Sequence, residues 1–120
     1  MKTAQKLYAI SRYPAPNGVC PENKDVNQCL NYRGSHDGYM FTLHSPLSSD
    51  ILKLLNFPWA SYGVENVIMW IFKNRLHYKI LNPCYILRVY HLHCSGLRST
   101  NRERYNHGGI SVVSRPTNDL

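Results

Sequence analysis

The sequence predicts an α/β or α+β domain with two helices and a long N-terminal loop. Predicted strands and helices alternate along the chain, which is typical of these fold classes. The length of 120 residues fits one domain. Hydrophobic residues make up 43% of the chain and charged residues 18%, which indicates a folded domain rather than a disordered segment.

Four apolar segments of strand length predict the sheet. The first ends at Pro14, because proline cannot donate a hydrogen bond to a neighbouring strand. The last two are separated by Asn82 and Pro83, a pair that favours a turn. The four expected strands are 6–13, 39–43, 78–81 and 85–92.

Two segments are expected to be helices. Ser48, Ser49 and Asp50 form a cluster of capping residues before a short helix at Ile51–Leu55. A longer helix spans Val64–Leu76, where apolar residues recur at intervals of three and four. Its predicted buried face consists of Val64, Val67, Ile68, Ile71 and Phe72. The long loop, at 14–34, precedes both helices and is rich in proline and asparagine.

The chain is basic. Fourteen Lys and Arg residues face seven Asp and Glu residues, which gives a net charge of +7. Such a balance attracts the phosphates of nucleotides, nucleic acids or membranes, or it simply keeps the surface solvated. The basic residues are scattered, and no helix-turn-helix, zinc-finger or RNA-binding signature occurs. The sequence therefore contains no clear nucleic-acid motif.

The N-terminus and the cysteines bear on the compartment. No apolar run reaches the about 18–20 residues of a membrane helix, and the first six residues lack the apolar core of a signal peptide. We therefore expect no membrane segment and, for the chain as written, a cytoplasmic protein. There Cys20, Cys29, Cys84 and Cys94 are expected to be reduced, although an even number of cysteines also suits two disulfides.

His91 and His93 are the first candidate site residues. Side chains two residues apart in a strand point to the same side, so both imidazoles can face one metal ion or phosphate. Cys84 and Cys94 would extend the pair to a zinc site, but the spacing is not a usual zinc pattern. The alternative is one packed histidine and one on the surface. Arg98 follows and can bind phosphate or form a surface ion pair.

Two carboxylates are candidates for a general base. Asp37 lies between turn-forming residues just before a predicted strand, where it can project into a site and accept a proton from a hydroxyl. It can equally cap an Asx turn. Glu65 lies in the first turn of the longer helix, where it can balance the helix dipole or point into a cleft.

The N-terminal part of the chain resembles two motifs of a group of small glycosyltransferase-like domains. Leu7–Tyr13 resembles their strand ALSRY or ALTRW. Ser35–Phe41 is similar to their segment SQDAWIF, with His36 in the place of the glutamine and Asp37 at the acidic position.

Two further motifs follow in the same order as in these domains. Residues 57–58 and Gly63–Asn66 resemble F-x-LG-x-PGCDNR, without the family's cysteine and arginine. Ile80–Cys84 and Tyr90–Arg98 resemble V-x-NP and HLHKS-x-x-R. The resemblance thus spans residues 7–98, which is most of the chain.

This resemblance implies a partial GT-A-type, Rossmann-like sheet and the transfer of a sugar from a nucleotide-sugar donor to an acceptor hydroxyl. It implies a divalent cation, Mn²⁺ or Mg²⁺, in preference to zinc. Asp37 and Glu65 match the acidic positions near the acceptor and are the implied catalytic residues. The implied metal-binding residues are His91 and His93, and the implied substrate-binding residues are Asn66, Ser95 and Arg98. The nucleotide-sugar and the acceptor are the expected partners.

The chain matches only the C-terminal half of such a domain, because the family's nucleotide-binding strands and its D-x-D metal motif have no counterpart here. The expected organisation is a glycosyltransferase-like half at 1–98 and a polar, loosely packed tail at 99–120. Two alternatives stay open. One is a non-catalytic interaction module of the same fold with a protein partner. The other is a small zinc-binding domain that uses Cys84, His91, His93 and Cys94.

Overall fold

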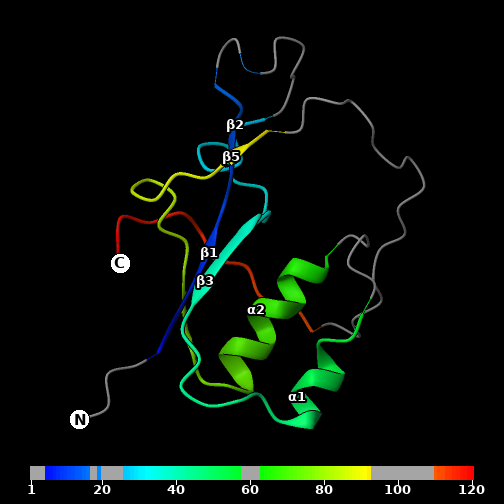
Figure 1. The fold of residues 1–120 in the computed structure, drawn as a ribbon. Helices are drawn as coiled ribbons and strands as arrows, with labels where there is room; N and C mark the ends of the chain where they lie inside the picture. Colours follow the sequence, from blue (N-terminus) through cyan, green and yellow to red (C-terminus); the bar gives the residue numbers. More distant parts are fainter. Residues whose placement is uncertain (1–4, 17–18, 20–25, 58–62, 93–109) are drawn as a thin grey trace.

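The computed structural model describes residues 5–16, 19, 26–57, 63–92 and 110–120, which form a mixed sheet with two helices (Figure 1). The central sheet has the strand order β3-β1-β4, and β1 pairs antiparallel with β3 and parallel with β4. The prediction of a small α/β fold with two helices is confirmed. The elements are β1 at Lys6–Ile10, β3 at Gly38–Phe41, α1 at Ser49–Leu54, α2 at Val64–Asn74 and β4 at Lys79–Leu81.

Both helices lie on the same side of the central sheet (Figure 1). Leu7 and Ala9 of β1 point to this side and are fully buried in a core cluster with α2. From β3, the ring of Phe41 contacts the ring of Phe72 in α2, with centroids 4.8 Å apart. The other side of the sheet carries Tyr8, and no helix of the described residues covers it.

The predicted buried face of α2 is confirmed, since all of its residues are buried. Helix α2 begins after Gly63, whose φ of 87° lies in the left-handed region that favours glycine. Helix α1 begins at the predicted cap, where the Ile51 N–H donates to the Ser48 hydroxyl oxygen at 3.3 Å. In the described part of the chain, neither helix is long and apolar enough to span a membrane.

A second sheet pairs β2 (Tyr13–Pro14) with β5 (Tyr90–His91) in parallel. The prediction of one strand at 85–92 is wrong over most of its length. Residues 84–87 form a turn, in which the Leu87 N–H donates to the Pro83 carbonyl oxygen at 2.8 Å. The turn that the Asn-Pro pair indicates is therefore longer than predicted and leaves only two residues for the strand.

A disulfide joins the long loop to the turn after β4. Cys29 and Cys84 are bonded to each other, and both are buried beside Ile10 and Tyr13. The expectation of reduced cysteines is therefore wrong for this pair. Of the predicted loop 14–34, Pro14 belongs to β2, so the prediction is wrong there. The other described residues of the loop, 15–16, 19 and 26–34, have no helix or strand, as predicted, and the disulfide attaches the loop to the core. Cys20 and Cys94 lie outside the described residues.

The C-terminal segment 110–120 packs on the domain, whereas the sequence favours a loosely packed tail. Ile110 and Val112 pack against the core cluster that contains α2. Pro116 forms a parallel bridge with Asn82, and the Thr117 N–H donates to the Asn82 carbonyl oxygen at 2.9 Å. The two core-facing side chains lie at alternate positions of a short, mixed segment at the end of a polar stretch, which explains why composition alone misses this contact.

Candidate functional site

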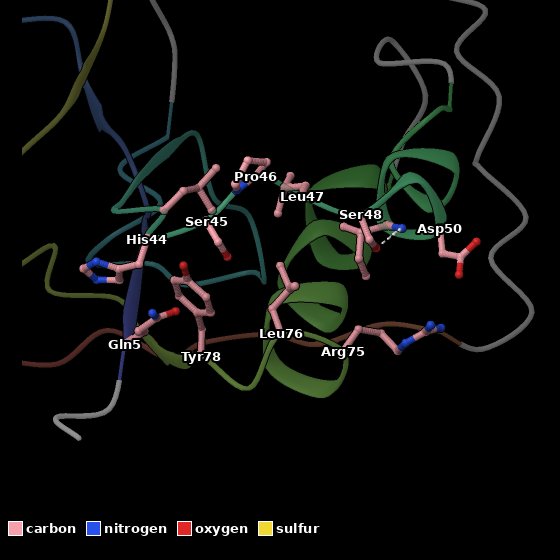
Figure 2. Close-up of a pocket in the computed structure, with 12 residues that line it drawn as sticks. Gln5, His44, Ser45, Pro46, Leu47, Ser48, Asp50, Arg75, Leu76 and Tyr78 are labelled. Atoms are coloured by element: carbon pink, nitrogen blue, oxygen red, sulfur yellow. Dashed lines mark hydrogen bonds between the residues drawn. The ribbon is translucent and has the colours of Figure 1, made fainter. Parts of the chain in front are cut away.

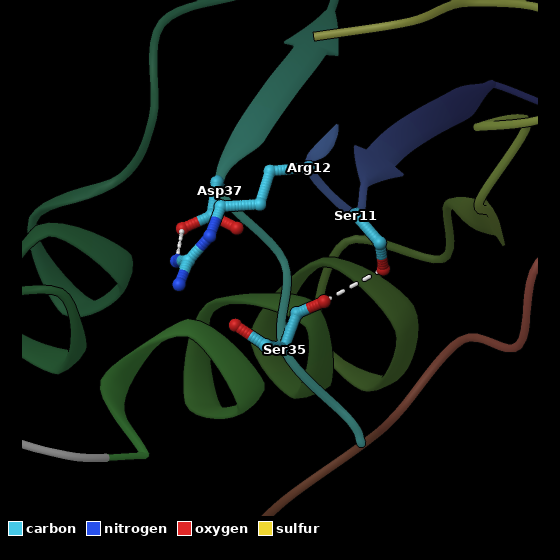
Figure 3. Close-up of polar contacts among 4 residues, drawn as sticks. All are labelled: Ser11, Arg12, Ser35 and Asp37. Carbon is cyan, nitrogen blue, oxygen red and sulfur yellow. Dashed lines mark hydrogen bonds and ion pairs between the residues drawn. The ribbon is translucent and has the colours of Figure 1, made fainter. Parts of the chain in front are cut away.

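Asp37 and Arg12 form an ion pair at the junction of β1 and β3 (Figure 3). The Arg12 Nη1 donates to the Asp37 Oδ1 at 2.9 Å. The antiparallel pairing brings the two together, because Ile10 lies opposite Gly38 and the Asp37 N–H donates to the Ile10 carbonyl oxygen. The Asp37 side chain remains 31% exposed, so a ligand hydroxyl can still reach it.

The negative charges of Glu65 and Asp37 both affect the pKa of one tyrosine, Tyr39. Tyr39 lies in β3, and its hydroxyl oxygen is buried without a hydrogen-bond partner among the described residues. Burial raises the pKa of the Tyr39 phenol, and the negative charges of Glu65 and then of Asp37 raise this pKa further. The negative charges of two carboxylates, one before β3 and one in α2, thus affect the same phenol. The catalytic role of both carboxylates stays a prediction.

A buried hydrogen-bond network holds the backbone next to this ion pair. Asn82 is fully buried, and its Nδ2 donates to the Ser11 hydroxyl at 2.8 Å and to the Ser114 carbonyl oxygen at 2.9 Å. Its Oδ1 accepts a hydrogen bond from the Ser11 N–H at 3.0 Å. The Ser11 hydroxyl in turn donates to the Ser35 carbonyl oxygen at 2.7 Å (Figure 3). Asn82 therefore holds Ser11, next to Arg12, directly, and it holds Ser35, near Asp37, through Ser11.

Asn66, a predicted substrate-binding residue, is held by the chain itself. Its Nδ2 donates to the Gly34 carbonyl oxygen at 3.2 Å and to the Val112 carbonyl oxygen at 3.0 Å. Its own carbonyl oxygen accepts the Val112 N–H at 3.1 Å. Both amide hydrogens are used, so Oδ1 is the side-chain atom left to contact a ligand.

His36 fixes the C-terminal segment on the other side of Asp37. It is 3% exposed, and its Nε2 lies 3.0 Å from the Ser114 carbonyl oxygen and 3.4 Å from the Tyr32 hydroxyl. Burial lowers the pKa of His36, against the opposing effects of the Ser114 carbonyl and the Asp37 carboxylate. The neutral imidazole is therefore the form that the folded protein favours.

We expect His36 to make the protein less stable in weak acid. Its folded pKa is lowered, so the unfolded chain binds the proton more tightly. The stabilisation is complete above the unfolded value of about 6.5 and is lost as the pH falls from there toward the folded pKa. Urea unfolding midpoints between pH 7.5 and 5.5 measure how steeply the stability falls with pH. His36→Gln should reduce this slope. The exposed His77, changed to Asn, is the control and should keep the wild-type slope. An unchanged slope in His36→Gln would exclude His36 as its source.

The remaining predicted site residues are only partly described. His91 lies in β5, where it pairs with Pro14 and is partly exposed. His93, Ser95 and Arg98 lie outside the described residues. Within the described part of the chain, no group of three or more His, Cys, Asp or Glu side chains is arranged to hold a metal ion.

The disulfide involves one cysteine of the alternative zinc site. A zinc ligand must be a thiolate, but the sulfur of Cys84 is bonded to Cys29. The proposed set of two cysteines and two histidines therefore lacks one of its ligands. The divalent cation that the family resemblance implies is unaffected and stays a prediction.

Sequence reasoning missed two residues of the site, Arg12 and Tyr39. Both belong to motifs that the sequence contains, yet neither motif shows that the two segments pair. The sequence does contain one usable signal. Arg12 lies near the end of the predicted strand 6–13 and Asp37 precedes the predicted strand 39–43, and antiparallel pairing of the two strands places such residues at one end.

No family model, no curated protein and no solved structure matches this chain. The four motifs are therefore the basis of the glycosyltransferase resemblance, and the GT-A type of fold stays a prediction. The described geometry adds that motif residues 25 and 71 positions apart in the sequence contact each other.

Proposed function

We propose that the chain is the acceptor-binding half of a glycosyltransferase-like enzyme, in which Asp37 and Glu65 bind and activate the acceptor hydroxyl. The observation that carries this proposal is the ion pair with Arg12, which orients the partly exposed Asp37 carboxylate. The negative charges of Glu65 and Asp37 both raise the pKa of the Tyr39 phenol, which supports a common role for the two carboxylates. Carboxylates beside an arginine offer several acceptors and donors, which suits the hydroxyls of a sugar.

In the proposed reaction, Asp37 or Glu65 accepts the proton of the acceptor hydroxyl while the oxygen forms a bond to the anomeric carbon of the donor sugar. The bond from that carbon to the diphosphate breaks, and its electron pair leaves with the nucleotide diphosphate. The Tyr39 phenol is neutral at pH 7, as an ordinary tyrosine is, and the raised pKa strengthens this preference, so its hydroxyl keeps a hydrogen to donate. This contribution would position the base rather than transfer a proton.

A divalent cation, when bound, would stabilise the charge on the departing diphosphate. The described residues that surround Asp37 and Glu65 do not form a metal-binding group. We therefore assign no step to a metal in this half. The resemblance implies that the donor nucleotide and the cation bind mainly to a second half of the enzyme.

Titration calorimetry with a panel of saccharides, and with nucleoside diphosphates in the presence of Mn²⁺, tests the proposal. The wild-type protein should bind at least one saccharide. Asp37→Asn and Glu65→Gln should each weaken that binding about tenfold, which corresponds to about 1.4 kcal/mol. The exposed Asp119, changed to Asn, is a control that removes the same charge and should bind like the wild type. The proposal is wrong if the wild type binds no saccharide, or if both variants bind as tightly as the control.

A non-catalytic interaction module is the second candidate. It is favoured by the internal use of Asp37 and Asn66, whose polar atoms contact Arg12, Gly34 and Val112. Exposed apolar side chains along and after β3 offer a surface for a protein partner: Met40, Phe41 and Leu43. Asp37→Asn and Glu65→Gln distinguish the two candidates. An interaction module keeps its biological activity when both residues lose their charge, whereas an enzyme that uses these carboxylates does not.

A further inference from the structure

Two adjoining hollows lie at the end of β3 opposite to Asp37. One has a volume of about 400 Å³ and the other about 490 Å³, and Gln5 and His44 line both. We call the combined depression the Gln5–His44 groove. Asp37 precedes β3, whereas the lining begins at Met40 within the strand, so the groove starts about 10 Å along the strand from Asp37. Each hollow is in the size range of small-molecule sites, and together they suit a ligand of several units.

The first hollow combines polar groups at its ends with apolar side chains between them (Figure 2). Gln5, His44 and Tyr78 lie at one end, and Arg75 lies at the other. Leu76 lies between the two ends. Because Tyr78 donates its hydroxyl hydrogen to the Thr42 carbonyl oxygen, its oxygen can accept a hydrogen bond from a ligand.

The second hollow extends onto the side of the sheet that no described helix covers. Lys6, Tyr8 and Met40 line it. Lys6 donates one hydrogen to the Leu120 carbonyl oxygen at 2.8 Å, and its ammonium group has two more donors. The Tyr8 ring and the Met40 side chain provide an apolar surface next to this cation.

We propose that the Gln5–His44 groove binds an anionic oligosaccharide. Amide, imidazole and phenol groups next to aliphatic side chains match a sugar chain, whose units present hydroxyls at their edges and C–H groups on their faces. Lys6 and Arg75, one in each hollow, match carboxylate or sulfate groups on separate units. Among the described residues of the lining, Asp50 is the single acidic one against Lys6 and Arg75, so this part of the groove has a positive balance, in line with the net charge of +7.

This proposal is independent of the proposed function, since it needs neither Asp37 nor Glu65. An acidic peptide is the competing ligand, because it too would be attracted to Lys6 and Arg75. The two differ in the neutral part of the ligand. A sugar chain presents many hydroxyls to Gln5, Ser45 and Tyr78, whereas an extended peptide of glutamates presents few donors beyond its backbone.

Titration of the full chain with three probes of equal length tests the proposal: tetragalacturonate, neutral maltotetraose and tetraglutamate. Tetragalacturonate should bind at least tenfold more tightly than either of the others, and its affinity should fall with added salt. The double variant Lys6→Gln, Arg75→Gln should weaken it about tenfold. The signals of the Gln5 side-chain amide and the His44 imidazole should shift in NMR spectra during the titration.

The matched control is Lys53→Gln, Lys73→Gln, which removes the same charge from exposed positions outside the groove. It should bind tetragalacturonate like the wild type. Equal loss in the control would show attraction to net charge alone, and equal binding of tetraglutamate would show a site for acidic peptides. Either result, or no binding of tetragalacturonate, overturns the proposal. Asp37→Asn and Glu65→Gln should keep tetragalacturonate binding, because neither residue lines the groove. Loss of binding in these two variants but not in the groove variant would place the ligand at the carboxylate site and overturn the proposal.

Discussion

Replacement of Asn82 by alanine should lower the free energy of unfolding by about 3–5 kcal/mol, a large part of the stability of a small domain. The Asn82 amide satisfies the Ser11 N–H, the Ser11 hydroxyl and the Ser114 carbonyl oxygen. Alanine would leave the buried Ser11 N–H without this partner, which costs about 1–3 kcal/mol. The Ser11 hydroxyl and the Ser114 carbonyl oxygen would keep their bonds to Ser35 and His36 but lose one hydrogen bond each, at about 1 kcal/mol per bond. Urea unfolding followed by circular dichroism measures the loss.

Asn74 provides the control for this substitution. Its Nδ2 also donates to a backbone carbonyl oxygen, that of Trp70 at 3.1 Å, but this bond lies on the exposed end of α2. Water replaces the lost bond there, and alanine is a better helix former than asparagine. Asn74→Ala should therefore change the free energy of unfolding by less than about 0.5 kcal/mol. If Asn82→Ala costs as little as this, the buried network does not stabilise the fold as we describe.

Local patterns in the sequence were sufficient for the helices. The spacing of apolar residues predicted the buried face of α2, and the Ser48 cap predicted the start of α1. Both features depend on residues within a few positions of each other, so they can be predicted without knowledge of the tertiary contacts. The apolar run at 6–10 was likewise sufficient to predict β1, because its alternate residues, Leu7 and Ala9, face the core.

Non-local contacts explain the predictions that were wrong. The segment 85–92 has the composition of a strand, but its first residues form a turn next to the disulfide at Cys84. The pairing of Cys29 with Cys84 depends on how the long loop folds back, which no spacing in the sequence determines. The polar tail lies on the domain because Asn66, Asn82 and His36 provide partners for its backbone, and these partners come from three distant segments.

The sequence predicted the carboxylates of the candidate site but not the neighbouring residues Arg12 and Tyr39. Asp37 and Glu65 stood out because each lies at the start of an element, where side chains project. Their common effect on the pKa of Tyr39 depends on how α2 packs against the sheet, which the sequence does not specify. The internal hydrogen bonds of Asn66 depend on the same packing and on the C-terminal segment.

Loss of the Cys29–Cys84 disulfide should destabilise the protein by about 4 kcal/mol. The bond connects residues 55 positions apart, and a cross-link that closes a loop of this length restricts the unfolded chain strongly. The double variant Cys29→Ala, Cys84→Ala, which leaves neither thiol unpaired, should show this loss in urea unfolding. Ile10→Val is the matched control, since it trims the same buried cluster without removing a cross-link and should cost about 0.5–1.5 kcal/mol.

The same disulfide leads us to expect an oxidising compartment rather than the cytoplasm that the sequence favoured, because disulfides of this kind persist where thiols are not kept reduced. Both half-cystines are almost fully buried, so a reductant reaches the bond only when the surrounding structure opens. Alkylation and mass spectrometry of protein isolated from its source should find Cys29 and Cys84 linked, and native protein should resist reduction until urea is added. Free thiols at both positions in freshly isolated protein would contradict the cross-link and return the expectation to a reducing compartment.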